Sequence, residues 1–590
     1  MANTTFSSGE LVTAAKLNTV NPSIIVTGGT TARTLADRFL DVVNVLDFGA
    51  STSAASGTTT NRVAFQAAID VAETAGDMVV IPAGNYNVDG TIVLKSNVAL
   101  VGENNAILTA TGNRSDYTTA VIRNENYETA AGNVNMRVEN LKIVGMDTEA
   151  QSDSITIVAG TNNGIGGIYF IYVSGCLINN VRTQDTWSGI VVNSVPTGVP
   201  TREASNEVTN CEVLRAQAWS MTGNSGRPRG IYMGTAGRLA NCESRDSGTG
   251  FYVTGNNLTV ENCSAVDPFV DNGYYIIAEN THFVNCRSVN VPYDDASTDA
   301  GDDYSSPPAD WFGSGFTIAY NKNGSFTGCL AEGCGNMGFR IHVKQSQTRI
   351  IGCQAIDCGY GFRIDNTSYV YTGSETPIAD YFCSELQLIG NIAQDSKVCG
   401  FQFTQMRNSI VSGNIVKNSN RGGVSTLTRG ALTLYNYCLF NLIMDNVAVD
   451  DQAVATSAGL YEYSNQSDEG GVGGGNEGNI IRNMQEINVA TRSDKVSVIS
   501  DKIQIWKDNH KVYNSAGTDV DTITCGGSEG FIGQSLLLRR DPDSTGTATF
   551  KDGVDNLRLA GDFAFDAADD SLFLLYDGSN WIEISRSSNA

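Results

Sequence analysis

The central half of the chain repeats a short pattern of apolar and polar positions. Each repeat opens with glycine, places an apolar or aromatic residue next, and then alternates polar with apolar side chains, which is the period-2 pattern of a β-strand. The opening glycines are Gly230, Gly250, Gly273, Gly315, Gly338, Gly361 and Gly400. They are 20, 23, 42, 23, 23 and 39 residues apart, which indicates a common period interrupted by insertions at 291–312 and 366–382.

A second column of small residues keeps step with these glycines. It consists of Cys242, Cys263, Cys286, Cys329, Cys353, Asn391 and Asn414. Repeats of roughly 20–24 residues with two or three short strands predict one coil of a parallel β-helix each, with equivalent residues stacked about 4.8 Å apart. We expect the column to point inward, with unbridged thiols in small apolar spaces and asparagine amides hydrogen-bonded between coils. A helical solenoid is disfavoured because no helical stripe accompanies the repeats.

The two flanks of the repeat follow other patterns. Residues 61–75 predict an amphipathic helix, with Asn61 as its N-cap, that covers the open end of the β-helix, and a strand is expected at 78–82. Residues 496–590 lose the period and show short strands with hairpin-type turns at 551–553 and 576–579, as in a small β-sandwich. The prediction is an all-β chain with an N-terminal segment 1–40, a single-stranded solenoid 41–495 and a C-terminal β-domain 496–590.

Composition agrees with a long, turn-rich β-protein and restricts the classes of partner that it can bind. The chain of 590 residues has 62 glycines and only 17% charged residues, and its net charge of −25 argues against a nucleic-acid partner. Thirteen cysteines without metal-ligand spacing and three histidines predict neither zinc nor any other metal or cofactor. The first residues lack a basic start and an apolar core, and no run of 18 apolar residues exists. We therefore expect cytoplasmic synthesis, no secretory signal and no membrane insertion.

Several segments resemble bacteriophage tailspike proteins with a pectate-lyase-like right-handed β-helix. Residues 32–50, with the motif Asp47-Phe48-Gly49-Ala50, and the helix 61–75 followed by 80–86 are similar to the entry of that β-helix. Residues 6–18 resemble a short tail-attachment segment, and residues 556–586 resemble a C-terminal domain of such spikes. The acidic stretch that often follows the motif is replaced here by 51–60, which leaves the implied fold unchanged.

This resemblance implies a homotrimer that contacts a phage tail or baseplate protein through its N-terminal segment. It implies that the C-terminal β-domain 496–590 serves trimerisation, receptor binding or both. It also implies a virion protein, assembled in the host cytoplasm, that acts at the host surface on a capsule, exopolysaccharide or O-antigen. It does not locate an active site.

The alternation within the repeat suggests where a saccharide would bind. If the residue after each glycine points inward, the next one points outward, and this outward column reads Tyr232, Tyr252, Tyr275, Thr317, Arg340, Arg363 and Gln402. A second column, two positions further on, reads Thr254, Ile277, Ala319, His342, Asp365 and Thr404, and a third reads Asn256, Glu279, Asn321 and Lys344. Tyrosine rings suit sugar rings and arginines suit sugar carboxylates. We therefore predict a binding site at the tyrosines and arginines of the first column, with Trp311 from the first insertion.

The candidate catalytic residues are Glu279, Asp365, His342 and Asp310. Glycoside hydrolysis uses two carboxyl groups roughly 5–9.5 Å apart, whereas Glu279 and Asp365 are three coil steps apart, about 14 Å. The second carboxyl group is therefore better sought in the acidic insertion, for example at Asp310. A lyase that uses His342 or Lys344 as base is an alternative, as is a binding fibre without catalysis. A secreted pectate-lyase-like enzyme is disfavoured by the expected lack of a leader. A tyrosine–arginine ladder that only packs, and an acidic loop that is solvated or binds calcium, remain the plainer interpretations.

Overall fold

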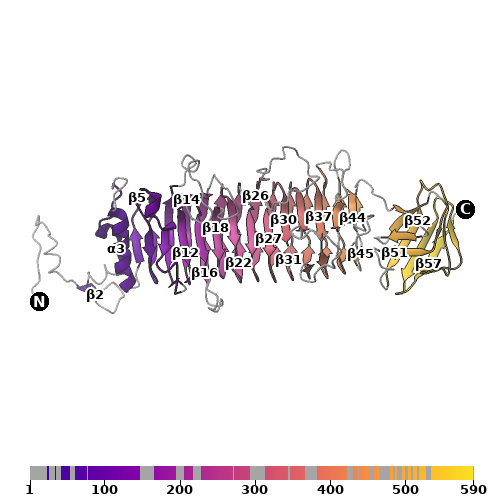
Figure 1. Ribbon diagram of the computed structural model, residues 1–590, viewed down its shortest axis with the longest axis horizontal. Helices are drawn as coiled ribbons and strands as arrows, with labels where there is room; N and C mark the ends of the chain where they lie inside the picture. The colour runs from indigo at the N-terminus through magenta and orange to yellow at the C-terminus, as the bar shows by residue number, and fades with distance from the viewer. Residues whose placement is uncertain are drawn as a thin grey trace, which may run out of the picture. The chain divides into compact units, whose positions relative to one another are not determined.

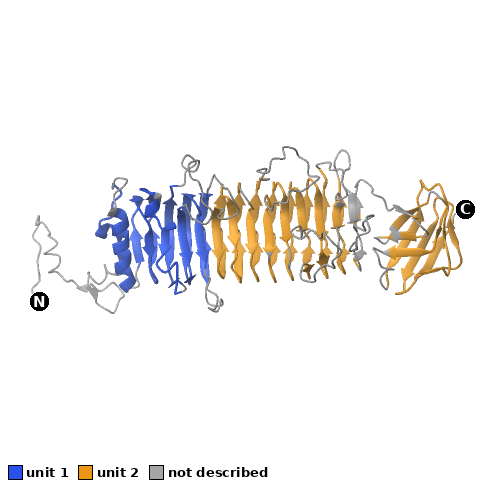
Figure 2. Ribbon diagram, in the orientation of Figure 1, with its two compact units in different colours: residues 1–226 blue, residues 227–590 orange. Residues whose placement is uncertain are grey.

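The structure is a computed structural model that describes most of the repeat and of the C-terminal domain. The described residues are 23–24, 33–34, 42–53, 60–75, 78–129, 131–146, 165–193, 205–216, 228–269, 272–292, 313–342, 346–365, 382–421, 430–435, 438–450, 458–463, 479–482, 485–487, 495–498, 502–505, 509–514, 517–525 and 533–588. The chain divides into two compact units, residues 1–226 and 227–590 (Figure 2).

Coils of a parallel β-helix make up the first unit between residues 42 and 216 (Figure 1). One face consists of the parallel strands β6 (Ile92–Leu94), β9 (Ala120–Asn124), β12 (Gly166–Ile171) and β15 (Ile190–Asn193). The other faces consist of β3 (Val42–Asn44), β4 (Met78–Ile81), β5 (Gly84–Val88), β7 (Ala99–Gly102), β8 (Ala106–Ala110), β11 (Arg137–Val144), β14 (Leu177–Thr186), β16 (Asn206–Thr209) and β17 (Glu212–Ala216). Shorter elements are β1 (Ser23–Ile24), β2 (Arg33–Thr34), β10 (Asn133–Val134), β13 (Val173–Ser174) and the 3-10 helices η1 (Val45–Phe48) and η2 (Arg114–Asp116).

The second unit contains the same kind of coil. Its first face, which carries the repeat glycines, consists of β18 (Arg229–Gly234), β21 (Thr249–Val253), β24 (Tyr274–Ile277), β27 (Phe316–Tyr320), β30 (Met337–His342), β33 (Tyr360–Asp365), β37 (Cys399–Thr404), β41 (Gly430–Tyr435) and β44 (Ala458–Tyr463). The second face consists of β19 (Gly237–Ala240), β22 (Leu258–Glu261), β25 (His282–Val284), β28 (Ser325–Thr327), β31 (Arg349–Ile351), β35 (Gln387–Ile389), β39 (Ile410–Ser412), β42 (Leu442–Met444) and β45 (Ile480–Arg482). The third consists of β20 (Glu243–Arg245), β23 (Ser264–Val266), β26 (Arg287–Val289), β29 (Leu330–Glu332), β32 (Gln354–Ile356), β36 (Ile392–Gln394), β40 (Ile415–Lys417), β43 (Val447–Val449) and β46 (Gln485–Ile487), and the short strands β34 (Cys383–Ser384) and β38 (Met406–Arg407) pair beside them. The predicted right-handed parallel β-helix is confirmed.

The helix predicted at 61–75 is α3 (Thr60–Ala75), which packs against the first strands of the β-helix. Its inward face is fully buried at Phe65, Ala68 and Ile69. The predicted N-cap is wrong, because the helix already begins at Thr60. The buried amide of Asn61 instead donates to the carbonyl oxygens of Ser51 and Asn87, at 3.0 and 2.9 Å, and so ties the helix to the adjoining loop and strand.

Close approach of two strands within one coil explains the repeat glycines. A Cβ atom on Gly250 would lie 2.6 Å from the Cβ of Ala265, and one on Gly338 would lie 2.6 Å from the Cβ of Ala355. Only a residue without a side chain fits at that distance. The residue after each glycine points inward as predicted, and these rings form a continuous stack: Phe251, Tyr274, Phe316, Phe339, Phe362 and Phe401, with centroids 4.5 to 4.7 Å apart.

The predicted inward column of cysteine and asparagine is also confirmed. The twelve cysteines whose side chains are described are all buried and free, and burial raises the pKa of the Cys176 and Cys399 thiols to about 12. Further along the chain, the amide oxygen of each asparagine accepts the backbone N–H of its counterpart in the preceding coil. Asn414 accepts from Asn391 at 2.8 Å, and Asn446 accepts from Asn414 at 3.0 Å.

An outer asparagine column, which the sequence patterns above did not predict, occupies the turns between strands. Asn257, Asn280 and Asn323 have φ angles of 57°, 51° and 58°, in the left-handed region that asparagine tolerates better than most residues. Their side-chain amides are hydrogen-bonded from one coil to the next at 3.2 Å. Each coil therefore turns at the same place.

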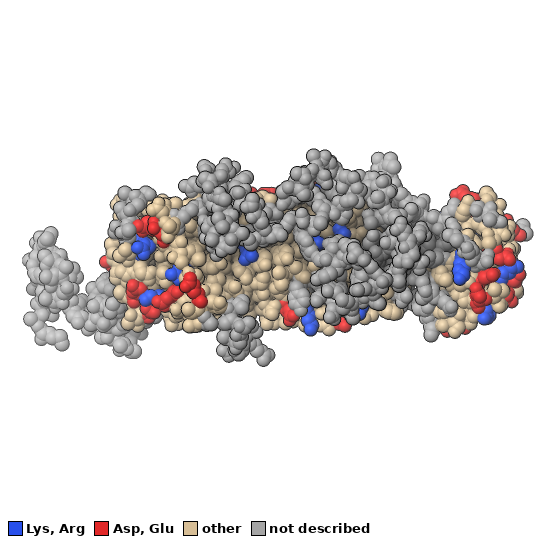
Figure 3. Space-filling view, in the orientation of Figure 1, with Lys and Arg blue, Asp and Glu red and all other residues tan. Residues whose placement is uncertain are grey.

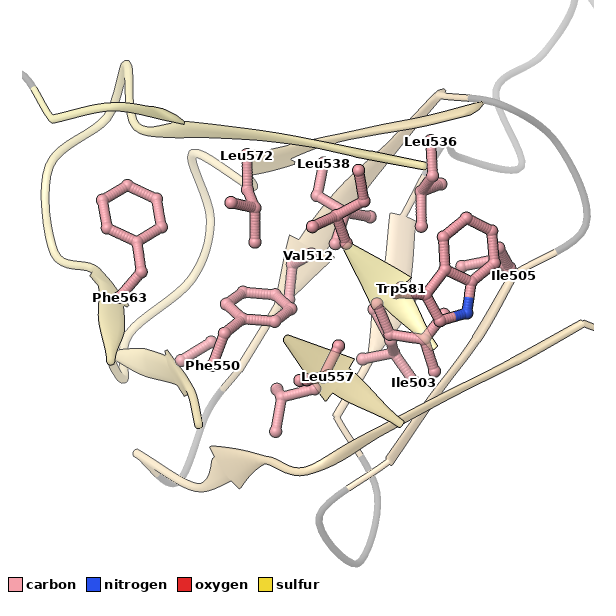
Figure 4. Close-up of a cluster of buried hydrophobic side chains, with 14 of the residues drawn as sticks. Ile503, Ile505, Val512, Leu536, Leu538, Phe550, Leu557, Phe563, Leu572 and Trp581 are labelled. Carbon is pink, nitrogen blue, oxygen red and sulfur yellow. The ribbon is translucent and has the colours of Figure 1, made fainter. Parts of the chain in front are cut away.

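The C-terminal β-domain has its own core (Figure 4). One sheet has the order β47 (Lys495–Ser497), β49 (Asn509–Tyr513), β52 (Ser535–Arg540), β56 (Ser571–Tyr576), β57 (Trp581–Ser587) and β54 (Leu557–Arg558). A second sheet has the order β50 (Asp519–Val520), β53 (Ala548–Phe550) and β55 (Phe563–Phe565), and β48 (Lys502–Ile505) pairs with β51 (Thr522–Cys525). The predicted turn at 576–579 joins the antiparallel strands β56 and β57, and the Asp577 carboxylate accepts the N–H groups of Ser579 and Asn580. Among the described residues, no helix is long and apolar enough to cross a membrane.

Candidate functional site

The predicted outward column exists and is in register. In β18, β21 and β24, Tyr232 lies opposite Tyr252, and Tyr252 lies opposite Tyr275. The alignment continues through Thr317, Arg340, Arg363 and Gln402 on β27, β30, β33 and β37. Parallel pairing without a slip over these positions brings residues that are up to 170 positions apart in sequence, from Tyr232 to Gln402, into one line.

The three tyrosines of this column form a platform together with Arg229. The rings of Tyr252 and Tyr275 are stacked, with centroids 5.4 Å apart and planes 9° apart, and Tyr232 meets Tyr252 edge-on at 5.2 Å. The guanidinium carbon of Arg229 lies 3.9 Å from the ring centroid of Tyr252 and 4.9 Å from that of Tyr232. We call these four residues the tyrosine platform. The sequence patterns above did not point to Arg229, although its place directly before the repeat glycine Gly230 is a usable signal.

Ring stacking decides how the tyrosine platform can bind a ligand. Because Tyr252 is covered by Tyr275 and by a guanidinium, its ring faces are occupied. The hydroxyl of Thr254 donates to the phenolic oxygen of Tyr232 at 3.1 Å, and all three tyrosines are half-buried. At Tyr252 the accessible groups are therefore the ring edge and the phenolic hydroxyl, and Arg229 adds a cation; such groups hydrogen-bond to sugar hydroxyls and attract sugar carboxylates.

The arginines of the column are less accessible than the alternation suggested. Arg340 is 3% exposed and Arg363 is 8% exposed, and Thr317 and Gln402 beside them are buried as well. The guanidinium carbon of Arg363 lies 4.6 Å from the ring centroid of Tyr360. Alternation fixes only the direction of a side chain. In a column with steps of about 4.8 Å, an outward side chain is also covered by its neighbours on the adjacent coils.

His342 and Asp365 lie opposite each other on the neighbouring strands β30 and β33, two positions beyond Arg340 and Arg363. Arg340 and His342 on β30 thus lie beside Arg363 and Asp365 on β33, so four residues with ionisable side chains are neighbours on two adjacent strands. The imidazole of His342 is buried, at 6% exposure. For Asp365 only the backbone is described.

Glu279 lies just beyond β24 and is half-buried. Its backbone N–H donates to the amide oxygen of Asn256 at 2.7 Å, so residues of the predicted third column meet across adjacent coils. Strand order places β24 three steps from β33, which agrees with the large separation expected between Glu279 and Asp365.

One predicted alignment in the second column is wrong. A β-bulge between Ile276 and Ile277 places Tyr320, not Ala319, opposite Ile277. The extra residue shifts the remainder of β27 by one position relative to β24.

Asp310 and Trp311 lie outside the described residues, as does Lys344. Of the two insertions, the structure describes only Val291, Pro292 and Phe382. In the described part of the chain, no group of three or more His, Cys, Asp or Glu side chains is arranged to hold a metal ion.

Residues 42–291 match a family model described as rhamnogalacturonase A/epimerase, pectate lyase-like. The predicted pectate-lyase-like character is thereby confirmed for this part of the chain. No curated protein sequence matches the chain.

Solved structures with similar arrangements are distant in sequence. The pre-mature gene product 12 of bacteriophage phi29 is 14% identical, with a TM-score of 0.49 over 82% of this chain and 63% of that one. A double mutant of the tailspike protein of E. coli bacteriophage HK620 is 13% identical, with a TM-score of 0.42 over 96% and 89%. The A-module of the Azotobacter vinelandii mannuronan C-5 epimerase AlgE6 is 16% identical, with a TM-score of 0.36 over 75% and 94%.

Proposed function

We propose that this chain is a subunit of a phage tailspike that binds and cleaves a bacterial surface polysaccharide on the outward column. The observation that carries the proposal is the in-register line of tyrosines and arginines on one face of a pectate-lyase-like β-helix. The segments at both ends of the chain, which resemble those of phage spikes, support it further. In this proposal residues 1–40 attach the spike to the phage tail or baseplate, and three copies form the spike.

Hydrolysis is the proposed reaction, with Glu279 as one of its two carboxyl groups. Glu279 lies four residues after Tyr275 on the same coil, roughly 13 Å along the chain, so the carboxylate would act on a sugar unit that neighbours the one held at the tyrosine platform. Asp365 is three strand steps away, which is too far for a direct partner. A carboxylate of the first insertion, such as Asp310, is the proposed second group, with Trp311 beside the bound sugar.

A lyase is the second candidate, and the register of Arg340, Arg363, His342 and Asp365 on adjacent strands favours it. Because Arg340, Arg363 and His342 are largely buried, a uronate would contact them only at their outer edge. In that reaction neutral His342 takes the proton next to a uronate carboxylate, and the arginines stabilise the negative charge that develops on the carboxylate. The electron pair forms a carbon–carbon double bond, and the glycosidic oxygen leaves and is protonated. A spike that only binds its receptor would use the same column without cleavage.

One experiment separates these candidates. The purified protein is incubated with capsule, exopolysaccharide and O-antigen of candidate hosts, and products are tested for new reducing ends and for unsaturated sugars that absorb ultraviolet light. Hydrolysis yields reducing ends without ultraviolet absorption, elimination yields both, and a receptor-binding spike shows binding without either. If the protein neither binds nor cleaves any polymer from a host that the phage infects, the proposed function is wrong.

A further inference from the structure

One histidine is exposed on the second face of the β-helix, which is not the face that carries the outward column. The chain has three histidines. His342 and His510 are buried, whereas His282 on β25 is exposed. The next residue, Phe283, is fully buried in the core, so alternation directs the side chain of His282 outward. This imidazole is therefore available for proton transfer at the surface.

The imidazole of His282 is hydrogen-bonded to a serine on the neighbouring strand. Its Nδ1 lies 2.8 Å from Oγ of Ser325, which is directly opposite His282 on β28. Ser325 is half-buried, and Phe326 after it points into the core, so the hydroxyl group also faces outward. In the tautomer that carries its proton on Nε2, Nδ1 accepts the hydroxyl proton. A histidine in that position activates a serine as a nucleophile.

A guanidinium group lies on the other side of the serine. Arg349 on β31 is opposite Ser325 and is exposed. Among the described residues its side chain has neither an ion pair nor a hydrogen bond, in contrast to Arg287, which pairs with Glu332 at 2.9 Å. On the face of the molecule drawn in Figure 3, charged side chains form small groups among uncharged ones. A cation one strand spacing away, about 4.8 Å, can stabilise negative charge that develops beside the serine oxygen.

We propose that His282, Ser325 and Arg349 form a site that hydrolyses acyl esters. Oγ of Ser325 attacks the carbonyl carbon of the ester while its proton passes to Nδ1 of His282. Arg349 stabilises the oxyanion of the tetrahedral intermediate. The carbon–oxygen bond to the alcohol then breaks, and the alcohol leaves with the proton from His282. Water attacks the acylated serine, and the acid is released as Ser325 regains its proton through His282. One ester and one water thus give one alcohol and one carboxylic acid.

The composition of the site sets the expected substrate and rate. Among the described residues no carboxylate is bonded to the imidazole, so the site is a Ser-His dyad and not a complete triad. We expect slow turnover and a preference for esters over amides, because an alcohol leaves more readily than an amine. The three side chains lie on an open sheet surface, which an extended polymer can reach. The ester is therefore assigned to a sugar hydroxyl of the polysaccharide. That assignment rests on the proposed function, but ester hydrolysis itself does not.

Hydrolysis of p-nitrophenyl acetate by the full-length chain tests the site. Ser325→Ala and His282→Gln should each lower the rate by roughly 10-fold or more, because nucleophile and base act together. Arg349→Gln should lower kcat by roughly 10-fold and leave KM nearly unchanged, because the guanidinium acts on the transition state. Far-ultraviolet circular dichroism should be the same for all of these variants.

Ser264→Ala is the matched control. Ser264 on β23 is half-buried and lies opposite Arg287, but its other strand neighbour is Glu243 and not a histidine. This variant should keep the wild-type rate, which excludes a general effect of removing a serine from the surface of a coil.

Covalent labelling separates catalysis from a hydrogen bond that only stabilises the sheet. A fluorophosphonate probe should modify Ser325 of the wild-type protein, as identified by peptide mass spectrometry, and should react about 10-fold more slowly in His282→Gln. Equal ester hydrolysis by the wild type, Ser325→Ala and His282→Gln would overturn the proposed site. Labelling of Ser325 at the same rate with and without His282 would overturn it as well.

An O-acetylated polysaccharide from a candidate host tests the source of the ester. The wild type and Glu279→Gln should release acetate, whereas Ser325→Ala should not. New reducing ends report cleavage of the polymer in the same samples. Acetate release without reducing ends would support the ester site and count against the proposed cleavage. Hydrolysis of p-nitrophenyl acetate without acetate release from any such polymer would overturn the polysaccharide as the source of the ester.

Discussion

At the scale of single residues, Glu279 is the sharpest test of the chemistry. Glu279→Gln should lower the rate of polymer cleavage by at least 10²-fold while leaving binding nearly unchanged, because the amide keeps the shape but cannot exchange a proton. Single-turnover cleavage and equilibrium binding of the same polymer measure the two effects. Glu207→Gln, at an exposed position of β16 on another face, is the control and should retain full activity.

Tyr275 tests how the tyrosine platform contacts its ligand. If the accessible groups are ring edges and hydroxyls, Tyr275→Phe should already weaken binding, by on the order of 1 kcal/mol for one lost hydrogen bond. Tyr275→Ala should weaken it further, because the ring that supports Tyr252 is also lost. Titration calorimetry with an oligosaccharide fragment gives both values. Wild-type affinity in both variants would place the binding site elsewhere.

The cysteines test the interior of the coils. Cys176 and Cys399 are buried, and burial raises the pKa of each thiol to about 12. A thiol reagent should therefore label the native protein slowly at pH 7 and pH 9 alike, because little thiolate forms below the raised pKa and the sulfur is covered. In denaturant all 13 thiols should react. Rapid labelling of Cys263, Cys286 or Cys353 in the folded protein would contradict their inward position.

At the scale of elements, the inner and outer asparagine columns should differ in their contribution to stability. Asn414→Ala removes amide bonds to the N–H of Asn391, to the carbonyl oxygen of Leu388 and to Asn446, all of them buried. Leaving those groups unpaired should lower the free energy of unfolding by roughly 2–5 kcal/mol, measured as a shift in Tm or in denaturant midpoint. Asn257→Gly in the outer asparagine column is the matched control and should cost under about 1 kcal/mol, because glycine accepts the left-handed φ of 57°.

The elements show why parts of the fold could be predicted and parts of the site could not. Gly338 and Phe339 recur because a missing Cβ and a stacked ring are needed on every coil, so their spacing fixes the register. At the bulge opposite Ile276 and Ile277, the extra residue belongs to β27 and lies after Gly315, within an interval that keeps the regular 23 residues, so the sequence period could not reveal it. The burial of Arg340 could not be predicted from the sequence either. Alternation within a strand shows to which side a side chain points, but not whether neighbouring residues cover it.

At the scale of the whole molecule, the C-terminal domain should contribute more to the assembly of subunits than to the folding of the β-helix. Deleting 496–590 removes the whole C-terminal domain with its separate core, whereas each remaining coil keeps its neighbours. The truncated chain should keep its β-sheet circular dichroism but lose the trimer mass in light scattering, or show a clearly lowered Tm. A truncated chain that assembles with wild-type stability would assign trimer formation to the β-helix itself.

The inner asparagine ladder has a consequence for how the protein is synthesised. The backbone N–H of Cys353 donates to the amide oxygen of Asn391, that of Asn391 to Asn414, and that of Asn414 to Asn446, so every donor is completed by a residue later in the chain. A newly formed coil thus presents an open N–H to the residues that next leave the ribosome. We therefore expect the coils of the β-helix to form one after another from the N-terminal side, in the direction of translation.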